Sequence, residues 1–175
     1  MVGLTRRWAV FAVLLAVLAA CAKPPPIPPP KPPLVVPARN LEISIQADAG
    51  VNPDARNRPA PVVIRIYELR APVAFEAADF FSLFDRDQAT LGNDLMTREE
   101  IQLRPGDTLK RVSELKPEAR VLGVVSAYRD LEHSVWRGTY VLPEPPAATT
   151  TPPDRPIVVP VQIVVGRNNV MVSGK

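Results

Sequence analysis

The sequence predicts a mainly β fold, a two-sheet sandwich with a short helical insertion, preceded by a proline-rich linker. From residue 39 onward, about seven short apolar runs are separated by turn-forming residues at intervals of roughly ten positions. Only residues 79–84 carry their apolar side chains at helical spacing. Residues 23–37 hold nine prolines, which excludes both helix and central strand from that segment.

The first residues have the pattern of an export signal. Arg6 and Arg7 supply positive charge, residues 8–18 form an uncharged apolar stretch, and two alanines follow as the small residues of a cleavage site. The stretch is shorter than the roughly 20 residues of a membrane-spanning helix, so we favour a signal peptide over residues 1–20 rather than a short anchor. The arginine pair only weakly resembles a twin-arginine signal, and we expect the general export route.

Cys21 is the only cysteine, and it closes the tetrapeptide Leu-Ala-Ala-Cys at the end of the apolar stretch. This tetrapeptide resembles a bacterial lipobox, which implies that Cys21 becomes the first mature residue and carries diacylglycerol and an N-acyl chain. Each methylene of an acyl chain that is buried in a membrane contributes about 0.8 kcal/mol of binding free energy. Two or more acyl chains therefore hold a protein firmly on a membrane that the polypeptide itself does not cross. In the bacterial lipoproteins that this segment resembles, an aspartate after the cysteine favours retention in the inner membrane. By this resemblance, Ala22 implies the outer membrane, with the protein facing the periplasm.

Cleavage would leave 155 residues, 175 less the 20 of the leader, which is enough for one domain with a core. It would also remove Arg6 and Arg7 and lower the formal net charge from +3 to +1. No basic cluster remains, and so we expect no nucleic-acid partner. A single cysteine cannot form an intrachain disulfide, so packing must stabilise the domain.

The proline-rich segment is predicted to be a spacer. Polyproline II extends about 3.1 Å per residue, which gives residues 23–37 a length on the order of 45 Å. A ligand for a groove-type binding domain is the alternative, and we favour the spacer. The predicted organisation is a lipidated Cys21 and spacer over residues 21–38 and a β-sandwich domain over residues 39–175.

The first half of the domain shows three local patterns. Residues 41–47 alternate apolar and polar side chains, which is typical of a strand with one wet face. A loop rich in proline, asparagine and aspartate covers residues 49–61, and residues 62–69 form a strand rich in β-branched side chains. Asp79 is the expected N-cap of a helix over residues 79–84, which is too short to be stable without packing its phenylalanines on the sheet.

The second half is predicted to contain strands joined by turns and by one long loop. The strands are expected over residues 99–103, 109–115, 120–128, 135–142, 157–165 and 170–172. Neither face of residues 120–128 is polar, so this strand should be the most buried. Turns are expected over residues 104–107 and 166–169, and a low-complexity loop over residues 143–156. Pro160 predicts an edge position or a bulge for its strand.

The sequence offers little chemistry for an enzyme. His133 is the sole histidine, so a two-histidine metal site cannot form, and we expect a solvated loop histidine. Two carboxylate pairs, Asp85 with Asp87 and Glu99 with Glu100, could act as acid and base on a sugar. We expect these carboxylates to be exposed.

Metal and phosphate sites are not indicated either. Asp48, Asn52 and Asp54 could offer oxygen ligands to calcium, but their spacing lacks the glycine and closing glutamate of an EF-hand. No glycine-rich phosphate loop is present. We therefore expect a protein that is not an enzyme and has no cofactor beyond the acyl chains on Cys21.

Several segments together resemble one family. They are residues 51–54, 58–69, 79–85, 91–95, 103–106, 123–131 and 136–137. With the lipobox-like tetrapeptide, their order and spacing resemble the TssJ (SciN) family, the outer-membrane lipoproteins of the bacterial type VI secretion system. The resemblance covers about residues 18–142 and implies a transthyretin-like sandwich with a small helical insertion.

The resemblance also implies a partner and a binding loop. Proteins of this family hold the periplasmic domain of the inner-membrane protein TssM, with TssL in the same trans-envelope complex. The loop between the first two strands is a principal contact, and here it corresponds to residues 50–60. The expected partner-binding residues are Asn52, Pro53, Asp54, Ala55, Arg56, Asn57 and Arg58.

The residue types of this loop suit binding. Prolines limit its unbound conformations, Arg56 and Arg58 can make bidentate contacts with acceptors, and Asn57 tolerates a left-handed backbone. A mobile surface loop without a partner is the alternative.

Two other functions remain open. A periplasm-facing lipoprotein carrier would bind a small hydrophobic ligand among Phe80, Phe81 and Phe84, although such a cluster more often belongs to the core. An envelope hydrolase would use the carboxylate pairs. We favour an anchoring lipoprotein over both.

Overall fold

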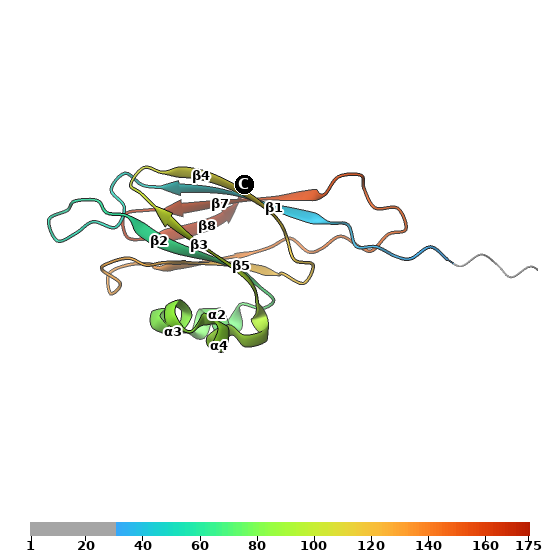
Figure 1. The fold of residues 1–175 in the computed structure, drawn as a ribbon, viewed down its shortest axis with the longest axis horizontal. Helices are drawn as coiled ribbons and strands as arrows, with labels where there is room; N and C mark the ends of the chain where they lie inside the picture. The colour runs from blue at the N-terminus through green and yellow to red at the C-terminus, as the bar shows by residue number, and fades with distance from the viewer. Residues whose placement is uncertain (1–30) are drawn as a thin grey trace, which may run out of the picture. The chain divides into compact units, whose positions relative to one another are not determined.

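In the computed structural model, which describes residues 31–175, eight strands form two four-stranded sheets that pack face to face (Figure 1). Residues 34–175 form one unit. The predicted leader, Cys21 and residues 23–30 of the spacer lie outside the described residues. Across residues 31–175, we find no helix with the length and apolar character needed to cross a membrane. The mainly β fold with a helical insertion is confirmed.

The first sheet is built on a parallel pair of strands from the two ends of the domain. Its strands, in spatial order, are β4 (Thr108–Glu114), β1 (Arg39–Ala47), β7 (Ile157–Val165) and β8 (Val170–Gly174). β1 and β7 run parallel, from Arg39 opposite Ile157 to Ala47 opposite Val165, and the other pairs are antiparallel. Because β1 and β7 end side by side, the loops that follow them lie at the same end of the sandwich.

The second sheet is antiparallel and contains the most buried strand. Its strands, in spatial order, are β3 (Leu95–Leu103), β2 (Val62–Leu69), β5 (Val121–Ser126) and β6 (Arg137–Val141). All six residues of β5 are buried, as its lack of a polar face predicted. Both faces of β5 are covered, since Leu122 and Val124 belong to the core between the sheets, while Val121 and Val125 pack under the helical insertion.

The core between the sheets follows the predicted alternation. Leu41, Ile43 and Ile45 of β1 are at most 3% exposed, while the residues between them are only partly covered. They meet the buried side chains of the other sheet, among them Ile64 and Leu122. Burying one such side chain fully contributes about 1.5–3 kcal/mol, so this seam can stabilise the domain without a disulfide.

A helical insertion between β2 and β3 covers the outer face of the second sheet (Figure 1). It contains α2 (Val73–Ala77), α3 (Phe80–Asp85), α4 (Asp87–Leu91) and the 3₁₀ turn η2 (Gly92–Asp94). α3 is the predicted helix, and Asp79 is its N-cap, because its carboxylate accepts a hydrogen bond from the Ser82 N–H at 2.9 Å. The sequence did not indicate α2 and α4, since five residues are too few to show a helical period.

A second apolar cluster holds the insertion to the sheet. Its buried members are Tyr67, Leu69, Phe75, Leu83, Leu91, Val121 and Val125. The Phe75 ring lies directly on Gly123, where a Cβ atom would come within 2.8 Å of the ring. Helices of five or six residues are marginal alone, so they depend on this packing.

The turns of the second half agree with the prediction, but Pro160 does not. β7 lies between β1 and β8 without a register shift, so the expected edge position or bulge is wrong. The Pro160 carbonyl accepts a hydrogen bond from the Lys175 N–H at 3.2 Å, which shows that its backbone faces the β8 side. β8 ends at Gly174, opposite Val161, so the missing N–H removes no hydrogen bond from the ladder.

Candidate functional site

Three connections meet at the end of the sandwich where β1 and β7 finish. They are the loop of residues 50–60, the β5–β6 connection of residues 127–136 and the β7–β8 turn of residues 166–169 (Figure 1). One backbone group of the loop binds a neighbouring connection, since the Asn52 N–H donates to the Arg167 carbonyl at 3.0 Å. Between the three connections lies a cleft of about 580 Å³, the end cleft, lined within residues 52–57, 128–134 and 167–168.

Asn52 fixes the base of the loop. It is only 4% exposed, and its Nδ2 donates to the Pro61 carbonyl at 2.7 Å while its Oδ1 accepts from the Arg129 N–H at 2.8 Å. Its φ of 48° is left-handed, a conformation that asparagine adopts more readily than most residues. Val51 and Ala60 are buried beside it and joined by a backbone hydrogen bond of 3.1 Å. Asn52 therefore acts on the loop from inside and presents little surface to a partner.

Asp54 organises the tip of the loop. Its Oδ1 accepts hydrogen bonds from the backbone N–H groups of Arg56 at 2.9 Å and Arg58 at 3.0 Å. Its Oδ2 accepts from the Arg58 Nε at 2.8 Å and pairs with the Arg58 Nη2 at 2.7 Å. The hydrogen bonds from Arg58, its side chain first, lower the pKa of Asp54. Arg58 is thus already engaged within the loop, although its side chain stays 69% exposed.

Asn57 ties the tip to the β7–β8 turn. Its N–H donates to the Asp54 carbonyl at 2.8 Å and closes a turn, and its φ of 62° confirms the expected left-handed backbone. The Asn57 Oδ1 accepts a hydrogen bond from the Arg167 Nη2 at 2.6 Å. The loop is therefore held both by its own side chains and by a residue 110 positions further along the chain.

The seven expected partner-binding residues differ in how far they are already used within the loop. Asn52, Asp54, Asn57 and Arg58 are committed to the structure of the loop, while Pro53 is half-buried. Ala55 and Arg56 are exposed, and the Arg56 guanidinium has no hydrogen-bond or ion-pair partner in residues 31–175. Contact with a partner stays a prediction for all seven.

The opposite wall of the end cleft was not foreseen. Tyr128 is buried, and its hydroxyl donates to the Asn169 carbonyl at 2.7 Å; burial raises its pKa. His133 is an exposed loop residue, as expected, and its Nδ1 lies 2.8 Å from the Asp130 Oδ1, which raises the pKa of His133. Nothing local in the sequence placed these residues, or Arg129 and Arg167, beside the loop of residues 50–60.

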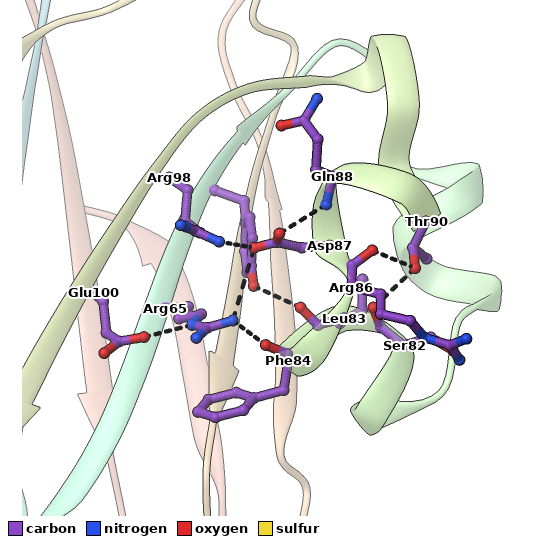
Figure 2. A network of polar contacts seen from close by, with 11 residues as sticks. Arg65, Ser82, Leu83, Phe84, Arg86, Asp87, Gln88, Thr90, Arg98 and Glu100 are labelled. Carbon is purple, nitrogen blue, oxygen red and sulfur yellow. Dashed lines mark hydrogen bonds and ion pairs between the residues drawn. The ribbon is translucent and has the colours of Figure 1, made fainter.

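Three of the four carboxylates in the predicted pairs, namely Asp87, Glu99 and Glu100, each form an ion pair with an arginine. Figure 2 shows the contacts of Asp87 and Glu100. The expectation that these carboxylates are exposed is wrong for Asp87, which is 5% exposed. Its Oδ2 lies 2.6 Å from the Arg98 Nη1 and 3.7 Å from the Arg65 Nη1, because α4 begins above β2 and β3. Arg65 also pairs with Glu100 at 2.6 Å. These contacts join the insertion to the sheet and leave no converging acid and base.

Arg65, shown in Figure 2, and Tyr67 also bind the backbone of the insertion. Arg65 donates to the Phe84 carbonyl, and the Tyr67 hydroxyl donates to the Leu83 carbonyl at 3.1 Å. The Arg65 guanidinium also lies 4.0 Å above the Phe84 ring. The second sheet therefore holds α3 by charge, hydrogen bonds and apolar contact together.

The phenylalanines of α3 pack on one another. Phe80 stacks on Phe84 with centroids 5.1 Å apart and meets Trp136 edge-on at 5.4 Å, while Phe81 is 62% exposed. None of the three lines the end cleft or the small pocket beside Arg39. The arrangement favours a packing role over a ligand pocket.

Metal coordination is not supported in the described part of the chain, where no group of three histidine, cysteine or acidic side chains could hold an ion. The oxygens considered for calcium are used otherwise. The Asp48 Oδ1 accepts from the Gly50 N–H at 2.6 Å, and Asn52 and Asp54 serve the loop.

The sequence and the fold are both similar to those of known proteins. A family model described as type VI secretion lipoprotein, VasD, EvfM, TssJ, VC_A0113 matches residues 39–168. The chain belongs to this family. No curated protein matches the chain. The matched residues of the type VI secretion lipoprotein family include every wall of the end cleft.

Solved structures agree with the family. TssJ1 from Pseudomonas aeruginosa, a type VI lipoprotein, is 33% identical with a TM-score of 0.70, over 79% of this chain and 98% of that one. Lip from Serratia marcescens, described as a membrane-bound component of the type VI secretion system, is 32% identical with a TM-score of 0.68, over 80% and 99%. A structure described as the TssM C-terminal domain from EAEC contains a chain 26% identical with a TM-score of 0.60, over 77% and 98%.

Proposed function

We propose that this type VI secretion lipoprotein is a non-enzymatic anchor in the trans-envelope complex. The acyl chains on Cys21 hold it on the outer membrane, facing the periplasm, and the loop of residues 50–60 binds the periplasmic domain of TssM in a complex that includes TssL. The observation that carries the proposal is the position of the loop. The chain enters the domain at Arg39, and the loop follows Ala47 at the other end of β1, roughly 30 Å away.

The rigidity of the loop supports a binding role. Asp54 takes four contacts from Arg56 and Arg58, and Asn57 is fixed to Arg167. A segment ordered before association loses less conformational entropy on binding, which is the general benefit of preorganisation.

The comparison and the acidic residues support the rest of the proposal. A chain of the same fold occurs in the structure described as the TssM C-terminal domain. Asp87, Glu99 and Glu100 each pair with an arginine, which favours a structural role for them over acid–base catalysis.

Calorimetry with the periplasmic domain of TssM tests the loop. The mature chain would carry Cys21→Ser, so that it stays in solution, and residues 53–58 would be replaced by a Gly/Ser linker. Asn52 is kept, because it is buried in the base of the loop. We expect the exchange to abolish binding while the circular dichroism spectrum is retained. A matched exchange of residues 150–155, at the other end of β7, should leave the affinity unchanged.

Unchanged affinity after the exchange of residues 53–58 would refute the binding role of the loop. The anchor is tested separately by the intact mass of the membrane-extracted protein. We expect a triacylated Cys21 with residues 1–20 absent. In cells, Cys21→Ser should move the protein out of the outer-membrane fraction and stop secretion, whereas a retained leader would contradict the proposal.

A further inference from the structure

The end cleft contains two carboxylates, and each already contacts a basic side chain of the same chain. Asp54, on the loop, is paired with Arg58 at 2.7 Å. Asp130, on the facing connection, has its Oδ1 2.8 Å from the His133 Nδ1. Asp54 is therefore neutralised by Arg58, and Asp130 is neutralised when His133 carries its proton.

The arginines of the same cleft are not neutralised in this way. The Arg129 guanidinium has no hydrogen bond or ion pair within residues 31–175, where only its backbone N–H is used, by Asn52. Arg129 lies near enough to Asp54 to contribute to the lowering of its pKa, after Arg58, but it forms no ion pair with it. Arg167 uses one nitrogen, Nη2, on the amide oxygen of Asn57.

A third arginine extends this positive surface to the rim. Arg56 lies at the exposed tip between the lining residues Ala55 and Asn57, and its guanidinium has no partner across the described chain. Arg56, Arg129 and Arg167 are all exposed, so an incoming group can reach them. Because the loop and the turn are fixed to each other, the three guanidinium groups are presented on a preorganised surface.

The size and lining of the cleft indicate the kind of ligand. A volume of about 580 Å³ lies in the range of sites that enclose a small ligand or a few residues of peptide. The lining also includes Asn168 and Ser134, and it combines polar and apolar surface. Guanidinium groups recognise carboxylates by paired hydrogen bonds, and unpaired positive charge steers acidic partners toward a site.

We propose that the end cleft binds an acidic peptide segment of the partner protein, whose carboxylates pair with Arg129, Arg167 and Arg56. This inference rests on the proposed function, because it names the chemistry that the partner offers to the loop of residues 50–60. The loop supplies shape and order, and the three arginines supply selectivity for negative charge.

A peptide titration tests the inference without TssM. The ¹⁵N-labelled mature chain with Cys21→Ser is titrated with hexaglutamate and, as a matched neutral probe, with hexaglutamine. We expect hexaglutamate to shift the amide signals of residues 52, 54–58, 128–134 and 166–169, and we expect this effect to fade as salt rises to about 0.3 M. Hexaglutamine should cause no such shifts. Equal effects of the two peptides, or no effect of either, would overturn the inference.

Charge reversal then links the cleft to the partner. Arg129→Glu and Arg56→Glu should each weaken both hexaglutamate and the TssM periplasmic domain by about tenfold or more. Arg155→Glu makes the same charge change on an exposed residue at the far end of β7 and should change either affinity by less than about twofold.

The two arms separate the inference from the proposed function. If the chain binds hexaglutamate in the cleft but not TssM, the acidic-peptide site stands and the proposed partner is wrong. If TssM binds wild type, Arg129→Glu and Arg56→Glu equally well, the proposed partner stands and the acidic-peptide site is refuted.

Discussion

Asn52 offers the sharpest test of how the loop of residues 50–60 is held, because one buried amide serves two segments. Asn52→Ala removes the hydrogen bonds to the Pro61 carbonyl and the Arg129 N–H, both of which lose a partner in a poorly solvated place. Each unsatisfied group costs about 1–3 kcal/mol. The φ of 48° adds about 1 kcal/mol for alanine. These contributions add up to about 3–7 kcal/mol, and we expect a loss of about 3–5 kcal/mol because both hydrogen bonds are only partly buried.

Two further substitutions divide this loss into its causes. Asn52→Gly loses the same hydrogen bonds but tolerates the left-handed backbone, so it should be more stable than Asn52→Ala by about 1 kcal/mol. Asn57→Ala, at an exposed position with a φ of 62° and one hydrogen bond from Arg167, is the control and should cost less than half as much.

Urea unfolding followed by tryptophan fluorescence measures all three variants. After cleavage of the leader, Trp136 is the remaining tryptophan, and it packs beside Phe80. A loss below about 1 kcal/mol for Asn52→Ala would refute the assignment of Asn52 as the support of the loop. So would Asn52→Gly proving less stable than Asn52→Ala, because the left-handed backbone would then carry no cost.

Three further predictions concern other parts of the fold. Gly123→Ala places a Cβ 2.8 Å from the Phe75 ring and should lower the free energy of unfolding in urea by about 1–3 kcal/mol. Phe75→Leu in the same chain should partly restore it, whereas a double variant whose loss equals the sum of the two single losses would contradict this contact. Asp87→Asn leaves Arg98 without its carboxylate partner and Arg65 with Glu100 alone, and it should cost about 1–3 kcal/mol. Asp85→Asn, on an exposed residue, should be neutral in the same urea unfolding. The pKa of the Asp54 carboxyl, measured by NMR titration, should lie below the ordinary value of 3.8. Because this pKa is lowered in the folded state, the contacts of Asp54 stabilise the fold above pH 3.8, and this stabilisation is lost as the pH falls through the folded pKa. Arg58→Gln should raise the measured pKa, and an unchanged value would contradict the role of Arg58.

The strands were predictable because their information is local. The alternation of apolar and polar residues in β1 reflects a strand with one covered face. The continuous apolar run of β5 reflects a strand with both faces covered. The N-cap at Asp79 likewise marked α3 by a signal within three residues. Helices α2 and α4 gave no such signal, because five residues complete little more than one turn.

The end cleft could be predicted only in part, since its walls come from distant segments. The loop of residues 50–60 was visible from its composition and from the family resemblance. The contact of Asn57 with Arg167 depends on the parallel pairing of β1 and β7. No local sequence pattern predicts this pairing, because the two strands lie far apart in the chain. The burial of Asp87 depends in the same way on Arg65 and Arg98, which belong to two different strands.

The parallel pairing of β1 with β7, which could not be predicted from the sequence, also suits the proposed role as an anchor. Under the proposed function, tension enters at Arg39 and leaves through the loop after Ala47, so it runs along β1. β4 and β7 pair with β1 on its two sides, and their hydrogen bonds lie across that direction. All pairs along β1 must then yield together, and the contact of Asn57 with Arg167 connects the loop to the turn after β7. A strand at the edge of the sheet would offer only one such ladder, which is a physical reason for the tethered strand to lie inside the sheet.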